Sequence, residues 1–263
     1  MQTWQSKWAL VTGASAGIGR AFAARLAAGG THLVLTARRR ERLEQLAHEL
    51  RSKHSVQVET FPADLGQPSA PQQLFEFTAA RRIAIELLIN NAGFGAYGEL
   101  PRIPLARLLE MVQVNVAAVV QLTHLFLRPM LERRRGDVLI VSSTAAFQAV
   151  PYITAYAATK AFDLLFAEGL AEEMRPHGIR VCCLCPGSTR TEFHDTARQP
   201  KRTMRRQETP DKVARVGLEA LARGKSLVIS GMGNRLGVEG QRLVPRRFVT
   251  RVAASLFRPQ EPR

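Results

Sequence analysis

Short apolar runs alternate along this chain with longer stretches of helical periodicity, and this alternation constrains the possible folds more than any other feature. Helical patterns lie at 41–53, 104–135 and 155–174. Alternating strands and helices predict a parallel sheet, and strands that are apolar throughout indicate that both of its faces are buried. We therefore expect an α/β fold with one doubly wound parallel sheet of about seven strands and helices on both faces. The expected strands lie at 8–11, 31–40, 56–65, 85–93, 136–143, 179–187 and 225–230.

A glycine-rich turn joins the first expected strand to an alanine-rich helix. Gly13, Gly17 and Gly19 punctuate this turn with the spacing GxxxGxG, which differs from the GxGxxG of the commonest dinucleotide fingerprint. Glycine allows the backbone to bend and to approach a ligand closely, and the following helix presents free N–H groups that suit a pyrophosphate. The position of the turn, after a strand and before a helix, predicts a phosphate-binding site.

Tyr156 and Lys160 stand one helical turn apart in the segment 155–174, so both side chains lie on one face of the expected helix. A phenol has an ordinary pKa of about 10, and a neighbouring ammonium lowers this pKa because it favours the phenolate. A tyrosine tuned in this way can pass a proton to or from an alcohol or carbonyl oxygen. Taken alone, such a pair is more often a surface tyrosine and a solvated lysine, so its companion motifs decide the interpretation.

Six motifs follow one another in the order TGASAGIG, NNAG, Asn115, Ser143, YAATK and PGSTRT. Together they resemble the short-chain dehydrogenase/reductase family over residues 7–231. The resemblance implies a Rossmann-like domain that transfers a hydride between a nicotinamide cofactor and a carbonyl carbon. It also implies that Tyr156 is the catalytic acid/base and that Lys160 lowers its pKa and binds the nicotinamide ribose. Ser143 then matches the donor to the substrate oxygen, and Asn115 matches the residue that holds a relay water.

Two of these assignments have alternatives that the residues leave open. Ser142 offers an equally plausible hydroxyl, and Ser143 is preferred because its spacing to Tyr156 fits the family. Ser143 could also be a strand-end cap. Asn115 could simply be a polar residue that satisfies local backbone groups and bends an apolar helix.

The loop after the second strand indicates which dinucleotide binds. NAD-selective folds often place an acid there, whereas this chain has a basic run that includes Arg38 and Arg39. Guanidinium groups match a phosphate, so Arg38 is expected to contact the 2′-phosphate of NADP(H), with Ser15 adding a hydrogen bond. Arg39 could stack on the adenine or remain solvated. The resemblance places further residues along the cofactor: Ile18, Asp64, Leu65, Asn91, Ala92, Gly93, Pro186, Gly187, Thr189 and Thr191.

The formal net charge of +15 is not explained by the resemblance. It suggests attraction to an anionic partner such as NADPH, a phosphopantetheine-linked acyl carrier or an anionic membrane, although a basic soluble surface is the simplest explanation. Aromatic residues are not interleaved with the basic runs, which argues against nucleic acid.

Cys182, Cys183 and Cys185 lie in an apolar strand without a nearby histidine at ligand spacing. We therefore expect buried thiols, no metal site, no disulfide framework and a cytoplasmic location.

The 263 residues suit one catalytic domain, residues 1–240, with a cofactor half of about 1–135 and a catalytic half of about 136–240. A basic tail, 241–263, follows it and predicts a helix after Pro245. We expect this tail to dock on its own domain or on a sister subunit, with membrane contact as the secondary possibility. No run appears long enough for a membrane-spanning helix, and the early first strand leaves no room for a signal peptide. The expected tail stripe comprises Phe248, Val249, Val252, Ala253, Leu256 and Phe257, with Arg246, Arg247, Arg251 and Arg258 around it.

Together these features predict an NADP(H)-dependent oxidoreductase that interconverts a small-molecule carbonyl and its alcohol. The narrower alternative is a reductase of 3-oxoacyl thioesters. An alternative of a different class is a non-catalytic dinucleotide-binding regulator, which the joint presence of Tyr, Lys, Ser and Asn disfavours. The family's usual dimer helices correspond to 104–135 and 155–174, so a homodimer or homotetramer is expected.

Overall fold

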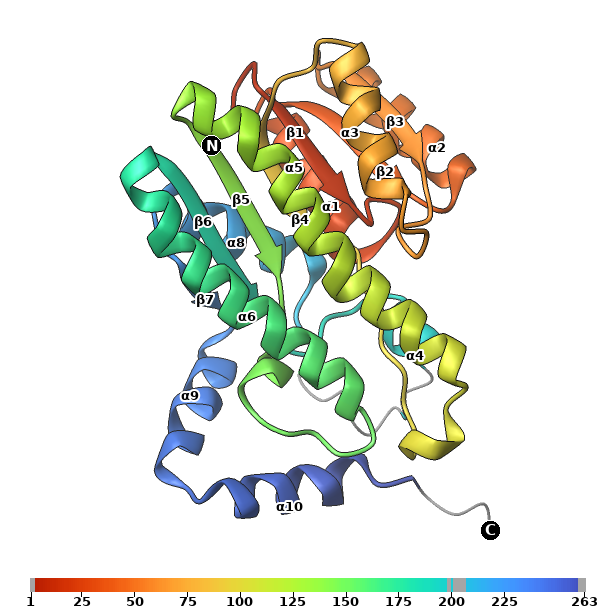
Figure 1. Ribbon diagram of the computed structural model, residues 1–263, viewed down its shortest axis with the longest axis vertical. Helices are drawn as coiled ribbons and strands as arrows, with labels where there is room; N and C mark the ends of the chain where they lie inside the picture. Colours follow the sequence, from red (N-terminus) through yellow and green to blue (C-terminus); the bar gives the residue numbers. More distant parts are fainter. Residues whose placement is uncertain (1–2, 198–199, 201–206, 260–263) are drawn as a thin grey trace.

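A seven-stranded parallel sheet forms the centre of the protein, as the sequence predicts (Figure 1). The computed structural model describes residues 3–197, 200 and 207–259. The strand order is β3-β2-β1-β4-β5-β6-β7. Successive strands are added on one side of β1 up to β3 and on its other side from β4 onward, so the order reverses between β1 and β4. Ligands of such sheets bind at the carboxyl ends of the strands beside this reversal. The strands are β1 Trp8–Thr12, β2 His32–Ala37, β3 Val58–Pro62, β4 Ile85–Asn90, β5 Gly136–Val141, β6 Ile179–Cys185 and β7 Leu227–Ile229.

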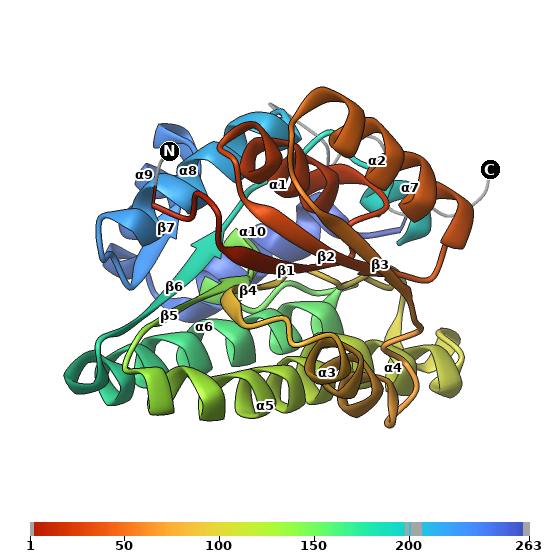
Figure 2. The same cartoon turned by 90° about the horizontal axis from the view of Figure 1, so that it is seen from above.

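Helices cover both faces of the sheet, which Figure 2 shows from above. Successive side chains of a strand point to opposite faces. Leu10 of β1 therefore belongs to one apolar core, whereas Ala9 and Val11 belong to the other. The helices α1 Gly17–Ala28, α2 Arg40–Lys53 and α8 Pro210–Ala222 cover one face, and α3 Ala70–Ala80, α5 Ala118–Arg133 and α6 Thr154–Met174 cover the other. The predicted doubly wound α/β fold is thus confirmed.

The expected long helix at 104–135 is divided into three parts. A π turn, Gln113–Ala117, separates α4 Leu105–Val112 from α5. By length and composition alone, the helical region Leu105–Arg133 could cross a membrane, which corrects the expectation that no segment reaches this length. Its buried residues, including Met111, Phe126 and Met130, pack in the apolar core beneath the sheet. One face of the region therefore packs in the core of this domain.

The remaining helices lie in the connections and at the end of the chain. The sequence patterns did not predict α3, α8 or α9. Short helices are η1 Leu100–Arg102, η3 Thr144–Phe147, η4 Arg175–His177, α7 Phe193–Thr196, α9 Met232–Gly240 and η6 Gln241–Leu243.

The predicted tail helix is present as α10 Arg246–Phe257, and it begins directly after Pro245. In Figure 1 it lies below the carboxyl ends of the strands, next to α9. Ala253 is buried in the core, and the Tyr97 hydroxyl donates a hydrogen bond of 2.8 Å to the carbonyl oxygen of Phe257. One side of the tail helix therefore docks on its own domain, as expected.

Candidate active site

A cleft of about 550 Å³ opens at the carboxyl edge of the sheet. The glycine-rich turn and the loops that follow the strands form its walls. Of the residues predicted to form the site, only Gly19 and Asn115 lie outside this lining, among the residues that the structure describes. The predicted residues that line the cleft are Gly13, Ser15, Gly17, Ile18, Arg38, Asp64, Leu65, Asn91, Ala92, Gly93, Ser143, Tyr156, Lys160, Pro186, Gly187, Thr189 and Thr191.

The glycine-rich turn depends on backbone conformations that side chains disfavour. Gly13 and Gly17 have φ angles of +65° and +53°. A Cβ atom at Gly19 would overlap the carbonyl oxygen of Gly13, so this glycine shapes the turn from behind the cleft wall. Asn91 anchors the same turn, because its Nδ2 donates a hydrogen bond of 2.8 Å to the carbonyl oxygen of Thr12. The N-terminus of α1 consequently opens into the cleft.

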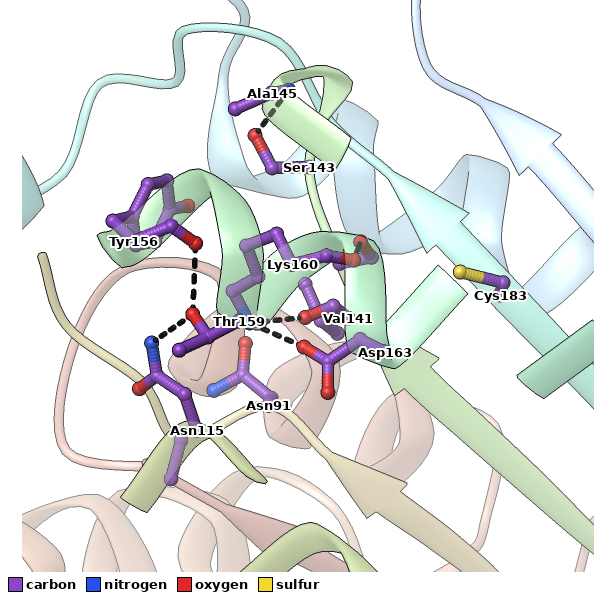
Figure 3. A network of polar contacts seen from close by, with 12 residues as sticks. Asn91, Asn115, Val141, Ser143, Ala145, Tyr156, Thr159, Lys160, Asp163 and Cys183 are labelled. Atoms are coloured by element: carbon purple, nitrogen blue, oxygen red, sulfur yellow. Dashed lines mark hydrogen bonds and ion pairs between the residues drawn. The ribbon is translucent and has the colours of Figure 1, made fainter. Parts of the chain in front are cut away.

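Helix α6 brings Tyr156 and Lys160 into the cleft from one face, as Figure 3 shows. The end of β5 anchors this helix at two points. The Ser142 hydroxyl donates a hydrogen bond of 2.7 Å to the carbonyl oxygen of Lys160, and Lys160 Nζ donates one of 2.8 Å to the carbonyl oxygen of Val141. Both serines line the cleft. The Ser142 hydroxyl is committed to the backbone of α6, whereas the Ser143 hydroxyl accepts a hydrogen bond of 3.1 Å from the amide of Ala145, so Ser143 also acts as the expected cap after the strand. The preference for Ser143 over Ser142 agrees with this geometry.

The pKa of Tyr156 lies above its ordinary value, which corrects the expectation of a lowered pKa. Burial raises this pKa because it disfavours the phenolate. The Lys160 ammonium and the nearby Ser143 hydroxyl lower it, as expected, but burial outweighs them. The phenol therefore keeps its proton at neutral pH.

Asp163 is a residue of this site that the sequence patterns did not single out. Its Oδ2 atom lies 2.8 Å from Lys160 Nζ, and its side chain is fully buried (Figure 3). Burial alone would lower the pKa of Lys160, but the Asp163 carboxylate raises it, and the net shift is upward. The ammonium is therefore held protonated. The spacing of three residues on one helix face is the signal that could have predicted this pair.

Asn115 lies in the π turn and is fully buried. Its Oδ1 accepts a hydrogen bond of 3.1 Å from the amide of Phe94. Its Nδ2 donates to the carbonyl oxygen of Phe94 and to the Thr159 hydroxyl, each at 3.0 Å. The side chain thus clamps the loop after β4 to α6, close behind the cleft wall. The expected contact with a relay water stays a prediction.

The two arginines after β2 have different partners. Arg38 lines the cleft and pairs with Glu110 at 3.2 Å. Arg39 donates hydrogen bonds to the Ser15 hydroxyl at 3.2 and 3.3 Å and pairs with Glu192 at 2.6 Å. Arg39 therefore links the glycine-rich turn to the loop after β6, so it is neither purely solvated nor, in this arrangement, free to stack on a ligand.

The cleft around Tyr156 is bordered by apolar side chains that lie outside the recognised motifs. The ring of Phe193 is centred 5.1 Å from the ring of Tyr156. Val150, Ile153 and Phe257 also line the cleft. Phe257 belongs to the predicted tail stripe, whereas sequence reasoning missed Val150, Ile153 and Phe193 because no motif marks this wall of the cleft. Together they give the cleft an apolar wall beside Tyr156.

The cysteines of β6 are buried free thiols. Burial raises the pKa of Cys182 to about 12, and the sulfur atoms of Cys183 and Cys185 lie 3.7 Å apart, beyond bonding distance. Within the described ranges, no group of three His, Cys, Asp or Glu side chains could hold a metal ion.

Comparison with known protein families shows which family the chain belongs to. The sequence model of the short chain dehydrogenase family matches residues 7–202. The chain is a short-chain dehydrogenase/reductase. The sheet topology of this short-chain dehydrogenase/reductase agrees with that assignment, and so does the order of its motifs. Members of the family act on carbonyl and alcohol groups.

Individual relatives of this short-chain dehydrogenase/reductase are moderately similar to it. An uncharacterized oxidoreductase of Myxococcus xanthus is 33% identical over 220 residues, 84% of this chain and 85% of that protein. The very-long-chain 3-oxoacyl-CoA reductase-B of Danio rerio is 35% identical over 185 residues, 68% of this chain but only 58% of that relative's length. A short-chain dehydrogenase from Sphingobium yanoikuyae, solved in complex with NADPH, superposes with a TM-score of 0.83 at 28% identity and covers 98% of both chains.

Proposed function

We propose that this short-chain dehydrogenase/reductase reduces an apolar carbonyl compound, or oxidises the corresponding alcohol, with NADP(H) and with Tyr156 as the acid/base. The observation that carries the proposal is the convergence of Tyr156, Lys160 and Ser143 on one cleft wall. Fold alone would not support this proposal, because dinucleotide-binding folds host many functions. The placement of the Tyr156 phenol, the buried Lys160 ammonium and the Ser143 hydroxyl together does support it.

The cleft residues fit a bound nicotinamide dinucleotide. The positive φ angles of Gly13 and Gly17 leave the backbone open to a pyrophosphate at the N-terminus of α1. A Cβ atom at Gly93 would lie 3.2 Å from Asn115 Oδ1, a tight contact, so a larger residue here would crowd the clamp that Asn115 forms behind the cleft wall. Arg38 would hold the 2′-phosphate, and Asp64 would face the adenine. When bound, the cofactor supplies or accepts the hydride.

The protein's own groups would manage the charge on the reacting oxygen. As a carbonyl is reduced, negative charge develops on its oxygen, and hydrogen bonds from Ser143 and Tyr156 would stabilise that charge. Tyr156 would then donate its proton to the oxygen. Lys160 would stabilise the resulting phenolate, and Asp163 would keep Lys160 protonated and in place. In the oxidation of an alcohol, the same phenolate would accept the proton.

The preference for NADP(H) over NAD(H) is tested by Arg38→Asp. We expect the wild type to bind NADPH more tightly than NADH by roughly tenfold to a hundredfold, because a charge-assisted hydrogen bond typically contributes about 1.5–3 kcal/mol. The variant should lose or reverse this preference. Fluorescence titration of both reduced cofactors measures it.

Arg40→Asp is the matched control for this test. Arg40 is as basic and as exposed as Arg38, but it pairs with Glu44 on α2 and does not line the cleft. The control should keep the wild-type preference. Equal affinities of the wild type for NADPH and NADH, or an equal effect of the two variants, would refute the role of Arg38.

A second candidate function is the reduction of 3-oxoacyl thioesters. The similarity to the reductase of Danio rerio and the apolar wall of Val150, Phe193 and Phe257 favour it. The chain spans 58% of that relative's length, so the relative's substrate is only a guide. Comparing kcat/KM for 3-oxoacyl thioesters of increasing chain length with kcat/KM for simple ketones distinguishes the two candidates. A rise with chain length supports the thioester substrate, whereas equal values for both classes argue against it.

We also propose that the protein forms homo-oligomers through α5 and α6. Leu165 on α6 is 70% exposed, and the rings of Phe162 and Phe166 stack at 5.4 Å on the same helix. An apolar helix surface of this kind indicates an interface. Light scattering at micromolar concentration should give at least the mass of a dimer, and Leu165→Glu should shift the mass towards the monomer. A monomeric wild type would contradict the proposal.

A further inference from the structure

Helices α9 and α10 lie at the end of the molecule below the sheet (Figure 1). A row of large apolar side chains is exposed along the segment formed by α9, η6 and α10. Most large apolar side chains of this protein are buried, so the concentration in so short a segment is unusual. We call this row the tail face. Its members are Met232, Leu236, Leu243, Val244, Phe248, Val252 and Leu256.

Helix α10 carries two apolar stripes, and docking on the domain uses only one of them. Ala253 and Phe257, spaced four residues apart, pack against the core. The second stripe recurs at the same spacing, and its side chains are 60%, 43% and 56% exposed at Phe248, Val252 and Leu256. Since the first stripe already holds the helix on its domain, intramolecular packing does not account for the second.

Arginines accompany the tail face along its whole length. Arg235, Arg246, Arg247 and Arg251 are all exposed. The tail face therefore combines insertable apolar groups with a strong excess of positive charge. Within the described part of 232–259 the only acid is Glu239, which pairs with Arg242 at 3.1 Å.

We propose that the tail face docks this protein onto anionic membrane surfaces. Basic helices with phenylalanine and leucine on one side lie in the plane of a bilayer, with the apolar groups below the headgroups and the cations beside the phosphates. A second copy of the chain fits the same surface poorly. A twofold interface would oppose one set of arginines to its own copy, and like charges at an interface repel.

The location of the tail face gives the docking a consequence for the cleft. Phe257, in the last turn of α10, lines the cleft, and the carbonyl oxygen of the same residue accepts the hydrogen bond from Tyr97. A docked α10 therefore brings the cleft near the lipid, where apolar substrates concentrate. This consequence rests on the proposed function, whereas the docking itself does not.

Sedimentation with vesicles tests the docking without substrate or cofactor. The full-length protein is mixed with phosphatidylglycerol/phosphatidylcholine vesicles or with pure phosphatidylcholine vesicles, at low and at high salt. We expect binding to the anionic vesicles that weakens with salt. The triple variant Arg246→Gln, Arg247→Gln, Arg251→Gln should bind on the order of a hundredfold more weakly at low salt, since each surface arginine contributes about fivefold.

Two further variants separate insertion from simple charge attraction. Leu256→Ser should reduce binding to anionic vesicles severalfold, whereas Leu109→Ser, which removes a similarly exposed leucine from α4, should not. Both sites are exposed, so both variants should keep the wild-type melting temperature. Absence of wild-type binding to anionic vesicles, or equal binding by wild type and triple variant, overturns the proposal. If the wild type does not bind vesicles and Leu256→Ser lowers the oligomer mass, the membrane proposal is wrong and the tail face binds a second copy of the chain. Because activity is not measured, failure here leaves the proposed function unaffected.

Discussion

Tyr156→Phe is expected to remove nearly all turnover while leaving cofactor affinity close to that of the wild type. Only the hydroxyl group is lost, and the ring keeps its place against Phe193. A positioned general acid typically contributes about 10²–10⁴-fold to the rate. We therefore expect kcat to fall by about that factor, with the dissociation constant of NADPH changed by less than about threefold. Steady-state kinetics and fluorescence titration of the same preparation measure both quantities.

Tyr152→Phe is the matched control for this substitution. Tyr152 lies four residues upstream and does not line the cleft. The control should keep wild-type kcat and wild-type affinity. Near-normal turnover in Tyr156→Phe would remove Tyr156 from the mechanism.

The pH profile of the wild type gives a second measurement of the same role. Reduction needs the protonated phenol, and burial raises the pKa of Tyr156 above its ordinary value. The value of kcat/KM for reduction should therefore stay level through neutral pH and fall only as pH rises past about 10. Oxidation needs the phenolate, so its rate should rise with pH instead. Lys160, Asp163 and Cys185 are the groups whose charges act on this pKa.

Lys160→Ala is expected to lower turnover, cofactor affinity and stability together. The ammonium would stabilise the phenolate and bind the nicotinamide ribose, so both turnover and cofactor affinity should fall. Its removal also leaves the buried Asp163 carboxylate without its partner. Breaking a buried ion pair from one side costs about 3–5 kcal/mol, so the free energy of unfolding should fall by an amount of that order. Denaturant unfolding measures this loss.

The double variant Lys160→Ala, Asp163→Ala separates the two effects. With both charges removed, most of the lost stability should return, whereas turnover should remain at the level of the single variant. If the single variant is as stable as the wild type, the buried pair does not carry this energy. Full turnover in the double variant would exclude Lys160 from the chemistry.

The fold was largely predictable because its signals are local. Each strand is a short apolar run, and the alternation of strands with helices implies a parallel sheet. The order of the strands in the sheet was not predicted and comes from the structure. The helices α3, α8 and α9 were missed. Pro71 and Pro210 stand in the first turns of α3 and α8, where proline favours a helix start, so these two helices had a local signal that went unused. Helix α9 is short, and Gly233 and Gly237 interrupt it.

The site was predictable where a motif carries it and unpredictable where the chain must first fold. Gly13, Ser143 and Tyr156 belong to motifs, and the structure brings them to one cleft. The link from Arg39 to Glu192 joins residues far apart in the sequence, so no local pattern contains it. The upward shift in the pKa of Tyr156 likewise depends on its burial, which only the folded structure determines.

The tail shows the same division between local and nonlocal information. The helix after Pro245 and its apolar periodicity were predicted, and α10 confirms both. The sequence could not reveal that Ala253 faces the core while Phe248 faces outward, because both positions belong to one broad apolar surface. Which side of such a surface is covered depends on the rest of the fold.

The central claim is tested most directly by following NADPH oxidation and alcohol formation together, with the purified protein and a panel of ketones, aldehydes and 3-oxoacyl thioesters. We expect at least one of these carbonyl compounds to yield one alcohol for each NADPH consumed, and we expect Tyr156→Phe to abolish both signals. If the protein binds NADPH but consumes none with any carbonyl, and reduces no NADP with the matching alcohols, it is a dinucleotide-binding regulator and the proposed activity is wrong.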